Sequence, residues 1–110
     1  DHYYIDRDNF NTWFEVGHYQ QDANAYWGSN KTIQYQHVVG IASRETKSLI
    51  LYVNGIKRAE ESWDGVINSD ISSWGVGFSY MNHNGKWKLD ELRIYNRALS
   101  ENEIQQIIGQ

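Results

Sequence analysis

Apolar and polar residues alternate with a period of two along most of the chain, and clusters of Asn, Gly, Ser and Asp separate the short apolar runs. Because successive side chains of a strand point to opposite faces, this pattern is typical of antiparallel strands with one buried face. It predicts about seven strands. They cover residues 3–5, 12–19, 33–42, 49–53, 56–59, 73–78 and 87–95. Residues 20–32 are polar and are predicted to form a long loop.

Local residue choices predict three backbone features within this pattern. Asn54-Gly55 directly follows an apolar run, and since both residues tolerate a positive φ, they predict a tight hairpin turn. Gly40 lies inside a predicted strand, where the missing side chain allows a neighbouring backbone to approach closely. Leu89 and Leu92 are out of phase with a period of two, which indicates a β-bulge near Asp90.

The end of the chain predicts one short helix. Ser100 is placed to cap it, with Glu103 as the reciprocating residue of a capping box. Leu99 and Ile104 suit a hydrophobic staple across the same turn. Gly109 suits the end of the helix. The helix is expected to pack on the sheets through its isoleucines.

Length and composition indicate a single globular domain that spans residues 1–110. The chain is 40% hydrophobic and 15% aromatic, which is enough apolar surface for one core. Its net charge of -4 argues against nucleic acid as a partner. No apolar run approaches the roughly 20 residues needed to cross a bilayer, so membrane insertion is not expected. Cysteine is absent, which excludes disulfides and thiolate chemistry.

Three sequence blocks, in this order and spacing, resemble the laminin G-like and pentraxin-like branch of the concanavalin A-like lectin/glucanase superfamily. The blocks are Gln36–Gly40, Leu51–Gly55 and Leu89–Ser100, of which the last is the most specific. The resemblance implies an all-β fold, an antiparallel jelly-roll β-sandwich with the short C-terminal helix beside it. It also implies a secreted or cell-surface location, because such modules are commonly appended to extracellular glycosidases and adhesins.

Members of this family usually begin with several strands that precede the first strand found here. The resemblance therefore implies the later two thirds of a domain, with open sheet edges that need a partner. A second chain, a second copy or a missing N-terminal segment would complete the sandwich. A compact variant that closes its sheets with fewer strands is the competing interpretation.

The carboxylates do not form a catalytic arrangement. Glucanases of this superfamily use paired carboxylates at alternate positions of a strand, an arrangement that is absent from this sequence. Asp90 and Glu91 are adjacent and would point to opposite faces. Jelly rolls of the superfamily often hold one structural calcium ion, and the resemblance implies Asp90 as one ligand. The alternative is that Asp90 hydrogen-bonds a bulged backbone.

Aromatic and amide side chains in the predicted loops are the candidate ligand-binding groups. Sugars are held by stacking on Trp or Tyr and by planar partners for pairs of hydroxyl groups. Trp13, inside a predicted strand, is expected in the core, whereas core packing and exposure are both open for the tryptophans in loops. The predicted ligand-binding residues are Tyr26, Trp27, Trp63, Asp64, Tyr80, Asn82, His83 and Asn84.

Three functions follow from these observations. The first is a non-catalytic module of an extracellular protein that binds glycans or mediates adhesion. The second is a structural domain that assembles with other proteins by pairing through an open sheet edge. The third is a fragment of a glycoside hydrolase, which the absence of paired carboxylates disfavours.

Overall fold

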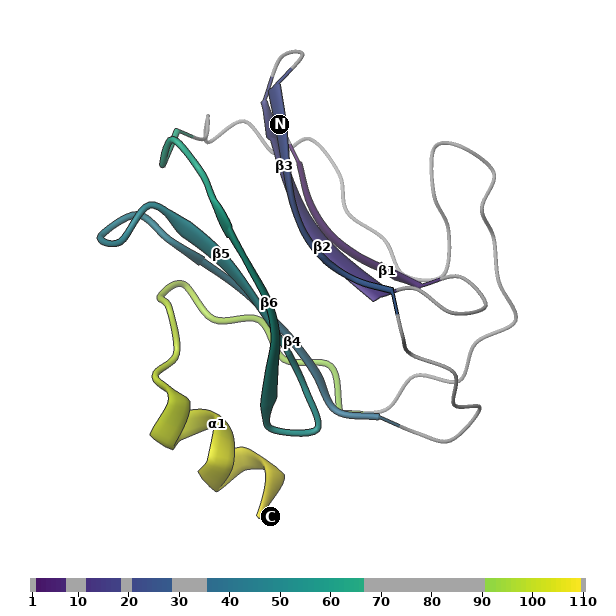
Figure 1. The fold of residues 1–110 in the computed structure, drawn as a ribbon. Helices are drawn as coiled ribbons and strands as arrows, with labels where there is room; N and C mark the ends of the chain where they lie inside the picture. Colours follow the sequence, from purple (N-terminus) through teal and green to yellow (C-terminus); the bar gives the residue numbers. More distant parts are fainter. Residues whose placement is uncertain (1, 8–11, 19–20, 29–35, 67–90, 110) are drawn as a thin grey trace.

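A computed structural model describes residues 2–7, 12–18, 21–28, 36–66 and 91–109 of the chain. Within these residues, two three-stranded antiparallel sheets face each other, and a helix lies on the far side of the second sheet (Figure 1). The first sheet has the order β1-β2-β3 and the second the order β4-β5-β6. The elements are β1 (His2–Arg7), β2 (Thr12–His18), β3 (Gln21–Trp27), β4 (Val38–Ser43), β5 (Ser48–Val53), β6 (Ile56–Ser62) and α1 (Glu101–Ile108). The predicted all-β sandwich with one C-terminal helix is confirmed.

The main core fills the space between the two sheets. Strand β2 contributes Phe14 and Val16, and strand β5 contributes Leu49, Leu51 and Val53, all of them buried. In each strand these residues are two positions apart, so they lie on one face. The period-two alternation of the sequence is thus observed as one buried face in each of these two strands.

The second sheet is covered on both faces, which explains the nearly continuous apolar sequence of β5. Its outer face carries Ile41 and Tyr52, which form a second buried cluster with Ile104 of α1. Leu99 packs against this cluster from the position before the helix cap. The helix thus closes the side of the sheet that faces away from β1-β2-β3 (Figure 1).

The hairpin turn predicted at Asn54-Gly55 is confirmed. Asn54 and Gly55 have φ values of 52° and 80°, as a two-residue type I′ turn requires. The turn is tied to the segment before β4, because the Asn54 N–H donates to the His37 carbonyl (2.7 Å) and Asn54 Oδ1 accepts from the His37 N–H (2.9 Å). It is also tied to the helix, since Gln105 Nε2 donates to the Gly55 carbonyl at 2.7 Å.

Gly40 permits a close approach, as predicted, but the neighbour is a side chain and not a backbone. A Cβ atom built at Gly40 would lie only 2.4 Å from Cδ1 of Phe14. Gly40 is on β4 and Phe14 is on β2, so this contact joins the two sheets. The absence of a side chain at position 40 is what lets the Phe14 ring fill the core.

The predicted helix cap is confirmed in detail. Ser100 Oγ accepts from the Glu103 N–H (3.2 Å), and Glu103 Oε1 accepts from the Ser100 N–H (3.0 Å). Arg97 adds a two-pronged ion pair to the same carboxylate, with Nη1 at 2.8 Å from Oε1. Together these contacts lower the pKa of Glu103 to about 2, with the Arg97 hydrogen bonds as the main cause. Gly109 caps the C-terminus with φ −71°, so the helix ends there without the left-handed conformation.

Two secondary-structure predictions are wrong within the described residues. Residues 21–27, predicted as part of a polar loop, form strand β3. Residues 91–95, predicted as the end of a strand, are not in a strand. Glu91 has φ 55°, so the backbone departs from strand geometry next to the predicted bulge. The predicted strand 73–78 lies outside the described residues.

Candidate functional site

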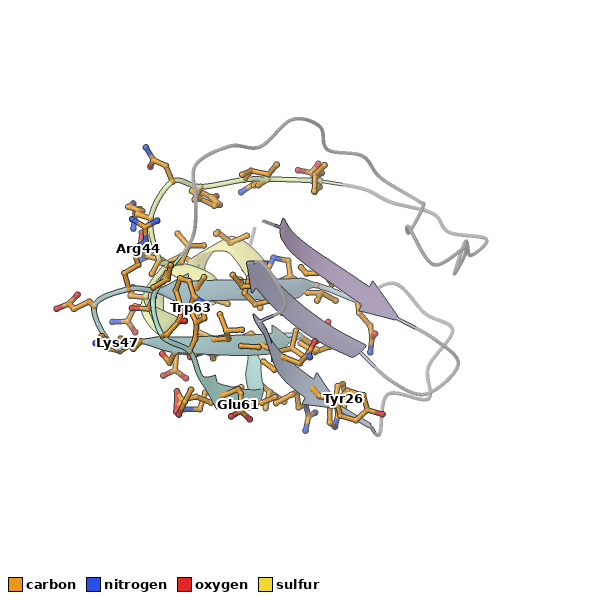
Figure 2. The ribbon with its side chains drawn as sticks, turned by 90° about the horizontal axis from the view of Figure 1, so that it is seen from above. Tyr26, Arg44, Lys47, Glu61 and Trp63 are labelled. Carbon is orange, nitrogen blue, oxygen red and sulfur yellow. The ribbon has the colours of Figure 1, made fainter. Side chains whose placement is uncertain are left out.

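Tyr26 and Trp27 stand at the end of β3, a strand of the first sheet and not a loop. The Tyr26 side chain is 55% exposed, whereas Trp27 is half-buried and packs against the main core. Adjacent strand residues point to opposite faces, so Tyr26 lies on the outer face of the sheet. Figure 2 shows Tyr26 at this end of the sheet, away from Trp63 and Lys47. The strand holds an exposed aromatic ring on a rigid support.

Arg58 of β6 contacts Trp27 from the second sheet. Its guanidinium carbon lies 4.4 Å from the centroid of the Trp27 ring, which is cation–π geometry. Strand β6 pairs with β5 in a register that shifts between Leu51 and Tyr52, which leaves Arg58 as an extra residue. Such a bulge redirects side chains of the strand. The sequence did not identify Arg58 as a site residue. A one-residue bulge in a short charged strand does not change the residue pattern in a way that the sequence alone reveals.

The strand register places further polar and aromatic positions beside Tyr26. Trp13 of β2 is the direct partner of Tyr26, and Asp6 of β1 is the partner of Trp13. Phe14 marks the core face of β2, so position 13 falls on the outer face with Tyr26. The Trp13 side chain, expected in the core, lies outside the described part of the structure. The three positions form a row across the outer face of the first sheet.

Trp63, predicted to bind ligand from a loop, is a core residue. Only 7% of its surface is exposed, and it packs in the main core between the sheets. Its backbone N–H donates to the Lys47 carbonyl at 2.9 Å. Its Nε1–H is buried and has no hydrogen-bond partner among the described residues. Of the two alternatives left open for Trp63, the structure shows core packing, because the chain after β6 folds back over the turn between β4 and β5.

Asp64 is exposed, and its carboxylate supports the local backbone. Asp64 Oδ1 accepts from the Val66 N–H at 2.9 Å, a turn stabilised by the side chain. Figure 2 places Trp63, its neighbour, far from Tyr26. The predicted groups Tyr26-Trp27 and Trp63-Asp64 are therefore not brought together into one binding site.

The remaining predicted site residues lie outside the described residues. They are Tyr80, Asn82, His83 and Asn84, predicted to bind ligand, and Asp90, predicted as a calcium ligand. In the part of the chain that the structure describes, no group of three or more His, Cys, Asp or Glu side chains could hold a metal ion. The calcium ion thus stays a prediction. Over the same residues, no helix has the length and apolar character to cross a membrane.

His37 is an ionisable residue whose ring nitrogen Nδ1 is buried. Within the part of the chain that the structure describes, its Nδ1 has no hydrogen-bond partner. Burial lowers the pKa of His37, and the nearby positive charge of Arg93 lowers it further. The imidazole is therefore mainly neutral at pH 7, and it is the backbone of His37 that bonds to the hairpin turn.

Comparison with solved structures gives the same architecture. A crystal structure of an S-layer domain-containing protein from Clostridium thermocellum (residues 221–444) superposes with a TM-score of 0.62 at 22% sequence identity. The match covers 89% of this chain and 51% of that chain, so this chain spans about half the length of that chain. At this identity the likeness shows the fold alone. Among curated proteins no relative matches the chain.

The sequence profile of a laminin G-like family, described as the concanavalin A-like lectin/glucanases superfamily, matches residues 1–105. This match covers nearly the whole chain, and the two facing antiparallel sheets agree with it. The chain belongs to the laminin G-like family of the concanavalin A-like lectin/glucanase superfamily.

Proposed function

We propose that the chain is a non-catalytic glycan-binding module of an extracellular or surface protein, and that it binds sugar on the outer face of β1-β2-β3 around Tyr26. The observation that carries the proposal is the exposed Tyr26 ring on a strand, next to a Trp27 ring held by Arg58. An exposed aromatic ring on a rigid sheet can stack on the C–H face of a sugar with little loss of side-chain entropy.

The strand register places two further positions of the first sheet beside Tyr26. Asp6 and Trp13 lie in register with Tyr26 across three strands. The spacing of adjacent strands, about 4.8 Å, matches the size of a pyranose ring. This row favours binding along the face over binding at the loop rim expected from the sequence.

Location outside the cell is the second part of the proposal. The family is named for lectins and glucanases, and a structural neighbour is part of an S-layer domain-containing protein. Both support a role at a surface.

Glycan-array screening followed by calorimetry with the best ligand tests the proposal. Tyr26→Ala should abolish measurable binding, whereas Tyr26→Phe, which keeps the ring, should retain most of it. Tyr95→Ala is the matched control, since Tyr95 is also exposed (43%) but lies in the segment before the helix. Circular dichroism should show unchanged folding for all three variants. Binding that survives in Tyr26→Ala, or no binding to any glycan by the unmodified chain, would contradict the proposal.

A further inference from the structure

Among the described residues, strand β6 is an edge strand of its sheet. It is the outermost strand of the order β4-β5-β6 among the described residues. All its residues from Ile56 to Ser62 are exposed except Ala59, which is half-buried. No strand among the described residues pairs with its outer edge. An uncovered edge presents a row of unpaired backbone N–H and C=O groups to any other strand that can approach it.

The charges along β6 have an order that makes the strand complementary to itself. Lys57 and Arg58 precede Ala59, and Glu60 and Glu61 follow it. If two copies of β6 pair antiparallel about Ala59, the basic half of each lies beside the acidic half of the other. A parallel pair would place like charges side by side, which is unfavourable. The charges protect the edge from other strands but fit a second copy in one direction.

The register within the sheet indicates which side chains would meet. Lys57 is opposite Tyr52, and Glu60 is opposite Ile50, so both point to the face that carries the helix. The extra residue at the bulge, Arg58, lets Glu60 of one copy come opposite Lys57 of the other when Ala59 is at the centre. Within one copy these two side chains form an ion pair of 3.3 Å, with about half of each side chain exposed. An ion pair so exposed is weak and easily exchanged for one between copies.

We propose that two copies of this chain associate through their β6 strands, antiparallel about Ala59, and join their β4-β5-β6 sheets into one continuous sheet. Two symmetric Lys57–Glu60 pairs flank the centre of this contact, as expected for a two-fold interface. Because the Tyr26 face belongs to the other sheet, this association is separate from glycan binding. It gives the edge-pairing hypothesis a specific strand, direction and partner.

Sedimentation velocity over a range of concentrations, with charge-reversal variants, tests the proposal. Lys57→Glu and Glu60→Lys should each weaken self-association by at least about tenfold, because each places like charges opposite each other twice in the symmetric pair. An equimolar mixture of the two variants should associate again, since each then meets its opposite charge. The double variant K57E/E60K should self-associate like the unmodified chain.

All these substitutions are at exposed positions and leave Tyr26, Trp27 and Arg58 unchanged, so glycan binding by each variant provides a separate readout. Thermal unfolding should confirm that each variant is folded. A chain that stays monomeric at its highest soluble concentration would overturn the proposal and show that the charges only protect the edge. Association that is unaffected by the single reversals, or not restored in the mixture, would overturn it as well.

Discussion

The contact between Gly40 and Phe14 gives the most direct test of how the two sheets pack. In Gly40→Ala, the new Cβ atom would lie 2.4 Å from Cδ1 and 2.5 Å from Cγ of Phe14. These atoms are at the base and side of the ring, and the ring is only 6% exposed. A small rotation cannot relieve the overlap, so either the ring must change rotamer or the sheets must separate locally.

The cost of Gly40→Ala follows from two opposing effects. Overpacking in a well-filled core costs about 1–3 kcal/mol. Replacing a strand glycine with alanine returns about 0.5–1 kcal/mol, because the unfolded chain loses conformational freedom. The expected net loss in free energy of unfolding is about 1–2 kcal/mol. For a chain of 110 residues, each kcal/mol lowers Tm by roughly 4–8 °C.

Urea unfolding followed by tryptophan fluorescence measures this loss directly. The midpoint should fall without a change in slope, since the surface exposed on unfolding is nearly the same. Adding Phe14→Leu to Gly40→Ala should cost at least about 1 kcal/mol less than the sum of the single effects, because the two residues share one space. Gly109→Ala is the control, since its Cβ would meet nothing closer than 3.5 Å. A Gly40→Ala chain as stable as the unmodified one would refute this account of the sheet packing.

Two further predictions concern the capped helix and the hairpin support. Ser100→Ala removes the acceptor of the Glu103 N–H and should lower the free energy of unfolding, measured in urea, by about 0.5–2 kcal/mol. Asn102→Ala, at an exposed position of the same helix, is the control and should leave the stability unchanged. An S100A chain as stable as the unmodified chain would refute the contribution of the cap. The pKa of His37 is lowered in the folded chain by burial and by Arg93, so protonation favours unfolding and stability should be lost as the pH falls below about 6.5. His37→Gln should flatten this part of the Tm profile, while the loss that begins near pH 4.5 and continues toward pH 2, where Glu103 protonates, should remain. An unchanged profile for H37Q between pH 7 and 5 would contradict the role of His37.

The elements that the sequence predicted correctly share a local cause. The Asn54-Gly55 turn and the Ser100 cap depend on conformations and hydrogen bonds within a few residues, which the residue types alone determine. Strand β5 was predicted because Leu49, Leu51 and Val53 are large and strongly apolar. Local chemistry and strong alternation were therefore sufficient for these parts of the fold.

Strand β3 was missed because its alternation is carried by small residues. Ala23 and Ala25 pack against or within the main core, but alanine is only weakly apolar, and Asp22 and Asn24 between them are typical of turns. What makes this segment a strand is pairing with β2 along its whole length. The sequence pattern of β3 is weak, and its strand conformation is determined by its pairing with β2.

The same reasoning explains why the candidate site moved from the loops to a sheet. Whether a tryptophan in a polar segment is exposed depends on which distant parts of the chain pack over it. The neighbouring residues in the sequence do not determine that packing. Trp63 follows the charged strand β6, yet it is buried because its backbone bonds to Lys47 and its ring enters the core. Tyr26 is exposed because the core side of β3 is taken by Ala25 and Trp27. Since adjacent side chains of a strand point to opposite faces, the pairing of β3 with β2 and the packing of its core side are the information that places Tyr26 on the outer face.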